Sequence, residues 1–122
     1  MLRMGSLTEF ERGLLAGLLI GVGHFGVSRG RGHFVLGMHI RHAALLRSVQ
    51  DLLPGSVLYG PYHHRGRYFL RLMLRGAALR ASLDIFDSLE LDRWCPHVAG
   101  RYEAMRSQAL TMPTRRSTRT VS

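Results

Sequence analysis

Alternating apolar and polar residues predict four β-strands in this chain, because side chains along a strand point to opposite faces in turn. The expected strands are residues 24–28, 33–42, 57–63 and 67–75. Two of them alternate most clearly, and their apolar faces consist of Phe34, Leu36, Met38 and Ile40 in one and Tyr68, Leu70, Leu72 and Leu74 in the other. Glycine-containing turns at residues 29–32 and 64–66 join the strands into two hairpins.

A different periodicity, typical of helices, separates and flanks the hairpins. The expected helices are residues 9–22, 43–53, 77–89 and 98–110. Thr8 is suited to cap the first, and Glu9 and Glu11 suit the positive end of its dipole. Leu79, Leu83 and Phe86 form the expected buried side of the third. This order predicts an α+β fold of the αββαββα type, an antiparallel four-stranded sheet with helices on one face.

Charge is distributed unevenly along the chain. The 17 basic side chains are all arginine, against 8 acidic ones, for a net charge of +9. Between Gly23 and Arg80 there are nine arginines and six of the seven histidines, but one acid, Asp51. A surface with this excess of positive charge attracts a polyanion at long range. Solubility alone is the alternative explanation, although it does not require acids to be excluded from the middle of the chain.

The polar positions of the strands also favour binding of a polyanion, because many of them are arginine or histidine. Arginine reads guanine in the DNA major groove with two hydrogen bonds, and a two-stranded ribbon fits that groove. For one strand alone, a polar face exposed only to solvent would explain the pattern. Two strands and two basic turns share the pattern, which favours binding of nucleic acid. The candidate DNA-binding residues are Arg29, Arg31, His33, His39, Arg41, Arg65, Arg67, Arg71 and Arg75.

The first helix carries Gly13, Gly17 and Gly21 at intervals of four, which places them in one stripe. Each glycine costs about 1 kcal/mol relative to alanine in a helix interior, so the stripe calls for an explanation. Small residues allow a second backbone to approach closely. We expect a homodimer contact here; close packing on the chain's own sheet is the alternative. The expected interface residues are Gly13, Ala16, Gly17, Ile20 and Gly21.

Length and cysteine content limit the remaining possibilities. The 122 residues suit one domain, expected at residues 1–110, followed by a basic, disordered tail at residues 111–122. The single cysteine, Cys95, excludes a disulfide framework and fits a reducing compartment. The longest apolar run, residues 14–22, is shorter than the roughly 20 residues of a membrane span. We expect a cytoplasmic, nucleoid-associated protein with no membrane partner and no evident small-molecule substrate.

Other chemically suggestive residues are better explained by packing or exposure. Cys95 and His97 have no second cysteine to complete a metal or catalytic site, and Cys95 precedes a proline at a helix boundary. We expect Trp94 in the core and the pair His63-His64 exposed beside a turn.

The segment at residues 15–23 reads LAGLLIGVG. It resembles the LAGLIDADG motif of the homing endonuclease family, and His24-Phe25 follows where that family often has Ser-Phe. Residues 33–53 resemble the family's second strand and next helix, and residues 67–86 its fourth strand and next helix, with Trp94 where many members carry a tryptophan. The resemblance covers about residues 8–108. It implies a saddle-shaped sheet and a homodimer whose motif helices pair at a two-fold axis, with both sheets straddling the DNA major groove.

One departure from the motif bears on catalysis. The family's metal-binding acid is the eighth motif residue, which is Val22 here, and the sixth, often Asp, is Ile20. Valine offers no oxygen ligand to Mg²⁺. Glu9 lies 13 residues earlier on the helix, roughly 20 Å away, and Asp51 would have to reach across the sheet. By family chemistry we therefore expect no catalytic residue, no metal site and no cofactor.

These observations predict a non-catalytic protein that binds double-stranded DNA as a homodimer through the arginine-rich face of its sheet. Two alternatives stay open. An active endonuclease with a relocated metal site would require Mg²⁺, and its nicking would disappear when a single acid is removed. An RNA-binding or protein-interaction module would use the same basic face for structured RNA, or the glycine stripe for a different chain.

Overall fold

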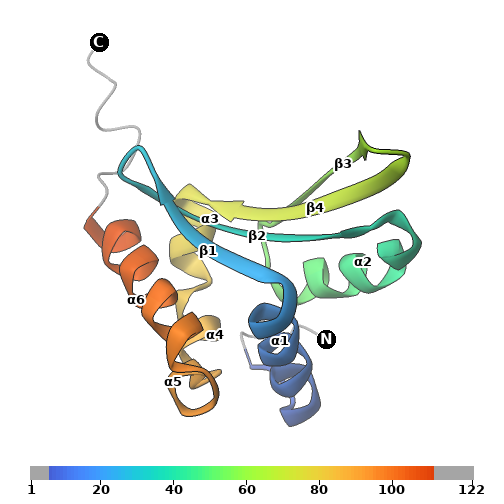
Figure 1. Cartoon of the computed structure of the whole chain (residues 1–122). Coiled ribbons are helices and arrows are strands. Elements are labelled where there is room, and N and C mark those ends of the chain that lie inside the picture. Colours follow the sequence, from blue (N-terminus) through green and yellow to red (C-terminus); the bar gives the residue numbers. More distant parts are fainter. Residues whose placement is uncertain (1–5, 112–122) are drawn as a thin grey trace.

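A single antiparallel sheet of four strands forms one layer of the structure, a computed structural model that describes residues 6–111. The strands lie in the order β1-β2-β4-β3, so the two hairpins meet at β2 and β4. Figure 1 shows that the strands curve and leave one face of the sheet concave and open. The strands are β1 (Gly23–Ser28), β2 (Arg31–His39), β3 (Val57–His64) and β4 (Arg67–Arg75).

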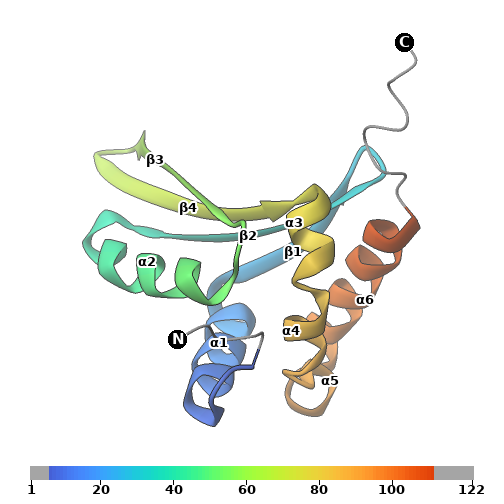
Figure 2. The same cartoon turned by 180° about the vertical axis from the view of Figure 1, so that it is seen from behind.

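Helices form the second layer and lie against the other face of the sheet (Figures 1 and 2). A short 3-10 helix, η1 (Ile40–His42), follows β2. The α-helices are α1 (Glu9–Val22), α2 (Ala43–Leu52), α3 (Gly76–Ala81), α4 (Leu83–Asp87), α5 (Leu91–Trp94) and α6 (Pro96–Thr111). The predicted α+β class and the antiparallel four-stranded sheet with helices on one face are confirmed.

The core lies between the two layers. Phe25 and Phe34 of the first hairpin pack against Phe86 and Tyr102 of the helical layer, with ring centroids 5.0–5.4 Å apart across the two layers. Apolar residues of each strand's inner face and of each helix surround this cluster. The predicted burial of Leu79, Leu83 and Phe86 is confirmed, since each is at most 4% exposed.

The start and end of α1 follow from its sequence. The Thr8 hydroxyl accepts a hydrogen bond from the Glu11 backbone, and the Glu11 carboxylate accepts one from the Thr8 backbone, both at 3.0 Å. This capping box satisfies two backbone donors that a helix start leaves unpaired. At the other end, a Cβ on Gly23 would lie 2.9 Å from the Leu19 Cα, so glycine allows β1 to leave the helix directly.

The second strand ends earlier than its pattern predicts. β2 stops at His39, whose Nδ1 accepts a hydrogen bond from the Arg41 backbone at 3.0 Å, and this local bond turns the chain into η1. The expected strand through residue 42 is therefore wrong at its end. Ile40 does not face the core, since it is 39% exposed, and Arg41 lies on η1 rather than on a strand.

The C-terminal helical region is also more divided than predicted. The helix expected at residues 77–89 is two helices that meet at Ser82, and α5, which was not expected, precedes α6. Trp94 is 64% exposed, so its predicted place in the core is wrong. The single turn of α5 buries Leu91 instead, and the Arg93 guanidinium stacks 5.0 Å from the Trp94 ring centroid.

The predicted domain boundary and tail are only partly visible. α6 continues through Thr111, one residue past the expected end of the domain, and residues 112–122 lie outside the described residues. Within residues 6–111, none of the helices combines the length and the apolar character needed to cross a membrane.

Candidate nucleic-acid interface

The predicted basic positions of β2 and β4 share the open face of the sheet. Residues directly opposite each other in an antiparallel pair project from the same face. His33 lies opposite Arg75, Gly37 opposite Arg71 and His39 opposite Phe69, while the intervening pairs contain the buried Phe34, Leu36 and Leu72. Arg67, Arg71 and Arg75 are all exposed. We call this open side of the sheet, together with its two hairpin turns, the outer face.

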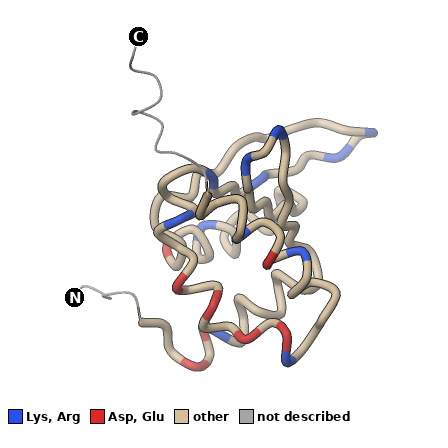
Figure 3. The backbone as a smooth tube through the Cα atoms, turned by 90° about the vertical axis from the view of Figure 1, so that its left-hand side faces the viewer, with Lys and Arg blue, Asp and Glu red and all other residues tan. Residues whose placement is uncertain are grey.

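Acidic residues are absent from the strands and turns that build the outer face. All eight lie in helices, apart from Glu90, which directly precedes α5. Figure 3 shows the result: acidic positions gather on the side of the helices, while arginines mark the strands and the hairpin tips. Because no carboxylate neutralises them locally, the arginines of the outer face form a region of positive charge.

Both hairpin turns hold an arginine at the tip. Arg29 and Arg65 adopt positive φ of 55° and 52°, followed by Gly30 and Gly66 at 75° and 78°. Two central residues with positive φ make a two-residue turn that matches the twist of the strands. An L-residue in this conformation costs about 1 kcal/mol, yet arginine occupies it in both hairpins. Each turn thus presents an exposed cation at an end of the sheet.

Two tyrosines that the sequence reasoning missed contact the arginines of the outer face. The Arg71 guanidinium lies 4.9 Å from the Tyr62 ring centroid. Arg75 lies 5.9 Å from the Tyr59 ring centroid and donates a hydrogen bond from Nη2 to the Tyr59 hydroxyl at 3.3 Å. These contacts restrict two long side chains that are otherwise free in solvent.

Strict alternation would place Tyr59 and Tyr62 on opposite faces, since they are three residues apart. The pairing of β3 with β4 shifts register between them, so that Tyr59 lies opposite Arg71 and Tyr62 lies opposite Phe69. Both tyrosines therefore join the outer face. The interruption at Gly60-Pro61 was the available signal, because such breaks accompany irregular strands.

His39 and Arg41 form a separate pair where β2 ends. The Arg41 side chain donates from Nε to His39 Nδ1 at 3.3 Å, in addition to the backbone bond. The pKa of His39 is lowered by loss of solvation and by the nearby cations Arg41, His42 and Arg67. A neutral His39 that accepts from Arg41 keeps that guanidinium beside the strand end.

The candidate catalytic position carries no acid. Val22 is 48% exposed at the C-terminal end of α1. Across residues 6–111, the structure brings together no group of three His, Cys, Asp or Glu side chains that could hold a metal ion. The expected lack of a metal site stays a prediction.

The glycine stripe of α1 faces away from its own sheet. Cβ atoms placed on Gly13, Gly17 and Gly21 would meet nothing within 4 Å, so the alternative of close packing on the sheet is wrong. Phe10, 75% exposed, lies three residues before Gly13 and extends the stripe. Ala16 is buried and Ile20 is partly buried against the core, so these two expected interface residues lie at its margin.

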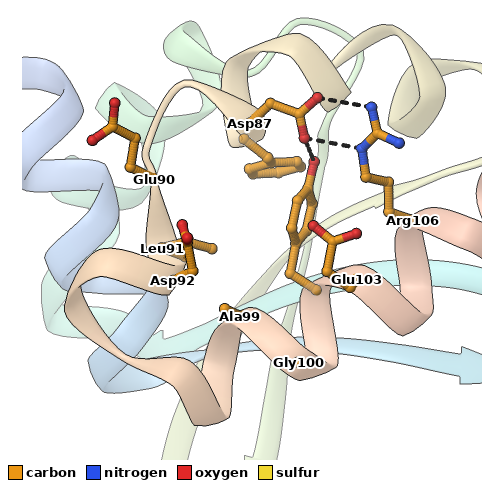
Figure 4. Close-up of a pocket in the computed structure, with 10 residues that line it drawn as sticks. Asp87, Glu90, Leu91, Asp92, Ala99, Gly100, Glu103 and Arg106 are labelled. Carbon is orange, nitrogen blue, oxygen red and sulfur yellow. Dashed lines mark hydrogen bonds and ion pairs between the residues drawn. The ribbon is translucent and has the colours of Figure 1, made fainter.

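A hollow on the helical layer is lined in part by acidic residues, in contrast to the basic outer face. It has a volume of 590 Å³ between α4, α5 and α6, and four of its lining residues are acidic: Asp87, Glu90, Asp92 and Glu103 (Figure 4). The Asp87 carboxylate accepts hydrogen bonds from Tyr102 at 2.6 Å and from Arg106 at 2.9 and 3.0 Å. The Arg106 bonds hold the pKa of Asp87 below its usual value. This hollow does not belong to the nucleic-acid interface.

Comparison with solved structures identifies the fold. The chain is similar to the homing endonuclease I-CvuI, solved in complex with its target, with 18% identity and a TM-score of 0.54, over 83% of this chain and 62% of that one. It is also similar to I-TnaI (16% identity, TM-score 0.52, 84% of this chain and 88% of that one). A third similar structure is the LAGLIDADG homing endonuclease I-GzeII, in complex with a DNA target (14% identity, TM-score 0.56, 91% of this chain and 46% of that one).

The chain thus has the fold of LAGLIDADG homing endonucleases, as the resemblance implied, and spans about three fifths of the length of I-CvuI. No protein-family model matches it, and no curated protein matches its sequence.

Proposed function

We propose that this protein binds double-stranded DNA with the outer face of its sheet, as a homodimer, and does not cleave it. The observation that carries the proposal is the outer face itself: exposed arginines on β4 and both hairpin tips, with every acid on the helical layer. The fold adds support, since I-CvuI and I-GzeII, which share it, were solved with DNA.

The spacing of the strand arginines suits a groove of duplex DNA. Arg67, Arg71 and Arg75 follow one another at four-residue intervals, about 13 Å apart at the rise of a strand. Base pairs stack at about 3.4 Å, so successive arginines fall roughly four base pairs apart. Arg71 and Arg75, which Tyr62 and Tyr59 contact, are the proposed readers of base edges. Arg29 and Arg65 at the tips are proposed to contact phosphates.

The proposal of a homodimer rests on α1. Its exposed stripe of three glycines leaves open space along the helix, and Phe10 adds an exposed aromatic ring at one end. Two copies paired here would present two outer faces related by a two-fold axis. The corresponding DNA site would then be two-fold symmetric.

The proposal that cleavage is absent rests on Val22. A hard divalent cation needs oxygen ligands, and this position supplies none. A DNA-binding protein of this kind would act in the cytoplasm, at the nucleoid.

A second candidate, binding of RNA, is favoured by one observation. Tyr59, Tyr62 and Phe69 lie on the outer face among the arginines, and Tyr62 is 42% exposed. Aromatic rings on a sheet stack with unpaired bases. Competition between duplex DNA, duplex RNA and single-stranded RNA at equal salt separates the candidates, because the main proposal requires duplex DNA to compete best.

Selection of bound sequences from a randomised duplex DNA pool in the absence of divalent metal tests the main proposal. A two-fold symmetric consensus is expected. Retention of DNA without any consensus would remove sequence-specific reading and leave only electrostatic attraction. Incubation of the selected duplex with Mg²⁺ then tests for cleavage, and a specific nick would contradict the non-catalytic assignment.

A further inference from the structure

His24 and His33 face each other above Gly26 on the outer face, at the edge strand β1. Their ring centroids are 5.7 Å apart. A Cβ on Gly26 would lie 2.7 Å from Nε2 of His33 and 2.8 Å from Nε2 of His24. The two ring nitrogens therefore converge on the space that a side chain at this position would fill.

Two arginines lie beside this pair. Arg75 lies directly opposite His33 on β4, and its guanidinium is held by Tyr59. Arg101 reaches β1 from α6 and places Nη2 2.8 Å from His24 Nδ1 and 3.3 Å from its Nε2. A guanidinium only donates hydrogen bonds, so the His24 nitrogen that it contacts must accept, which requires a neutral ring. Three elements, β1, β2 and α6, thus each contribute one nitrogen-bearing side chain to the same place.

The charged groups that act on His33 are cationic. Partial burial lowers the pKa of His33, and the neighbouring His24 and Arg75 lower it further. α6 adds Arg101, with His97 one turn earlier, whereas its acid, Glu103, lines the hollow on the helical layer (Figure 4).

The acids of α1 lie far from this group. Glu9 and Glu11 are in the first turn, and Glu9 is roughly 20 Å along the helix from the start of β1. No carboxylate thus takes part in the contacts described for the group. Convergent imidazole nitrogens also suit a transition-metal ion, but the adjacent Arg101 guanidinium and the positive charge of Arg75 disfavour a cation and favour an anion.

We propose that His24, His33 and Arg101 form a phosphate-binding site, which takes up a DNA backbone phosphate together with protons on the two imidazoles. This inference rests on the proposed DNA binding and adds to it a site and its regulation by pH. A protonated His24 has no lone pair for Arg101. Protonation therefore releases the Arg101 guanidinium, and all three groups then donate charge-assisted hydrogen bonds to phosphate.

Binding coupled to proton uptake weakens as pH rises. Each proton taken up changes the dissociation constant by up to about tenfold per pH unit, over the range where the free rings are neutral. We expect the dissociation constant for duplex DNA to rise about tenfold or more between pH 6 and pH 8 at constant ionic strength.

Fluorescence anisotropy with a short mixed-sequence DNA duplex tests this on the whole chain at pH 6, 7 and 8. The test variants are the double variant H24Q/H33Q and G26A, whose methyl group would push the rings apart. The matched control is H97Q, which removes an exposed histidine at the start of α6. In parallel, proton NMR follows the imidazole titrations with and without sodium sulfate, which stays dianionic throughout this pH range.

The expected result is a strong pH dependence in the wild type and in H97Q that is largely lost in both test variants. The proposal is overturned if H24Q/H33Q keeps the pH dependence of the wild type while still binding DNA. If the wild type binds no DNA at any pH, the proposed function fails, and the sulfate titration decides the site separately. Raised pKa values of His24 and His33 in sulfate support the site, and unchanged values overturn it.

Discussion

The hydroxyl of Tyr59 accepts a hydrogen bond from the Arg75 guanidinium at 3.3 Å, although the two residues lie on different strands and 16 positions apart. Arg71 is held in a comparable way by the ring of Tyr62, 4.9 Å away. An arginine already restricted before DNA arrives loses less conformational entropy on binding. The tyrosines of β3 therefore position the arginines that we propose as base readers.

This relationship predicts that Tyr62→Ala weakens discrimination between DNA sequences. An exposed cation–π contact is worth about 0.5–1 kcal/mol, so the ratio of dissociation constants for selected and scrambled duplexes should fall about two- to fivefold. Competition binding measures this ratio. The matched control is Tyr68→Ala, on the neighbouring strand and 49% exposed, which contacts the ring of His63 rather than an arginine. Equal losses in both variants would contradict a positioning role for Tyr62.

The glycine stripe predicts a dimer that a single side chain disrupts. Gly17→Leu should yield a monomer, because the new side chain occupies the space in which a second helix would approach. The monomer should stay folded, since a Cβ at this position meets nothing within 4 Å and removal of a helical glycine stabilises by up to about 1 kcal/mol. Sedimentation velocity gives the oligomeric state, and circular dichroism confirms folding.

Gly100→Leu is the control for this experiment. Gly100 lies in α6, and a Cβ there also meets nothing within 4 Å, so the substitution changes a helix in the same manner outside the stripe. It should leave the dimer intact. A wild type that sediments as a monomer, or a Gly17→Leu variant that stays dimeric, would remove α1 as the contact.

Asp87 predicts a stability effect that is separate from DNA binding. Its carboxylate joins α4 to α6 through Tyr102 and Arg106. The side chain is 37% exposed, so solvent screening limits the pair and we expect Asp87→Asn to lower the free energy of unfolding by about 1 kcal/mol at pH 7. Urea denaturation measures this change, and DNA affinity should not change because the residue lies on the helical layer.

The pH dependence of this effect has a definite sign. The folded-state pKa of Asp87 is below its usual value of 3.8, so the stabilisation is complete above that value and is lost as pH falls through the lower, folded-state pKa. The difference in stability between wild type and Asp87→Asn should therefore shrink below pH 4. A difference that stays constant into acid would mean that the carboxylate's charge contributes nothing.

The sequence predicts local structure well where periodicity reports burial directly. The alternation in residues 67–75 gave β4 with its true bounds, and the basic positions of that strand share one face as predicted. Local capping at Thr8 and the paired glycine turns were equally readable, because their chemistry involves neighbours in the chain. The family resemblance supplied the fold, which solved structures confirm.

The wrong and missed predictions have two causes: a local side-chain bond at His39, and tertiary contacts elsewhere. The side chain of His39 ends β2 by bonding to Arg41, which a strand pattern does not reveal. Tyr59 and Tyr62 share a face only because the pairing of β3 with β4 shifts register. Arg101 meets His24 across 77 positions of sequence, and Trp94 is exposed because α5 buries Leu91 instead. No spacing rule connects residues as distant as Arg101 and His24 before the chain has folded.

The most direct test of the proposed function compares two double variants with the same loss of charge. Arg71→Ala/Arg75→Ala changes the outer face, and Arg47→Ala/Arg93→Ala removes two exposed arginines from the helical layer. Dissociation constants for the selected duplex are measured across a range of salt concentrations. The account predicts a loss of at least about thirtyfold for the first variant, from two base contacts worth about 1–3 kcal/mol each, and a small change for the second. Equal losses in the two variants would contradict reading of DNA by this face of the sheet.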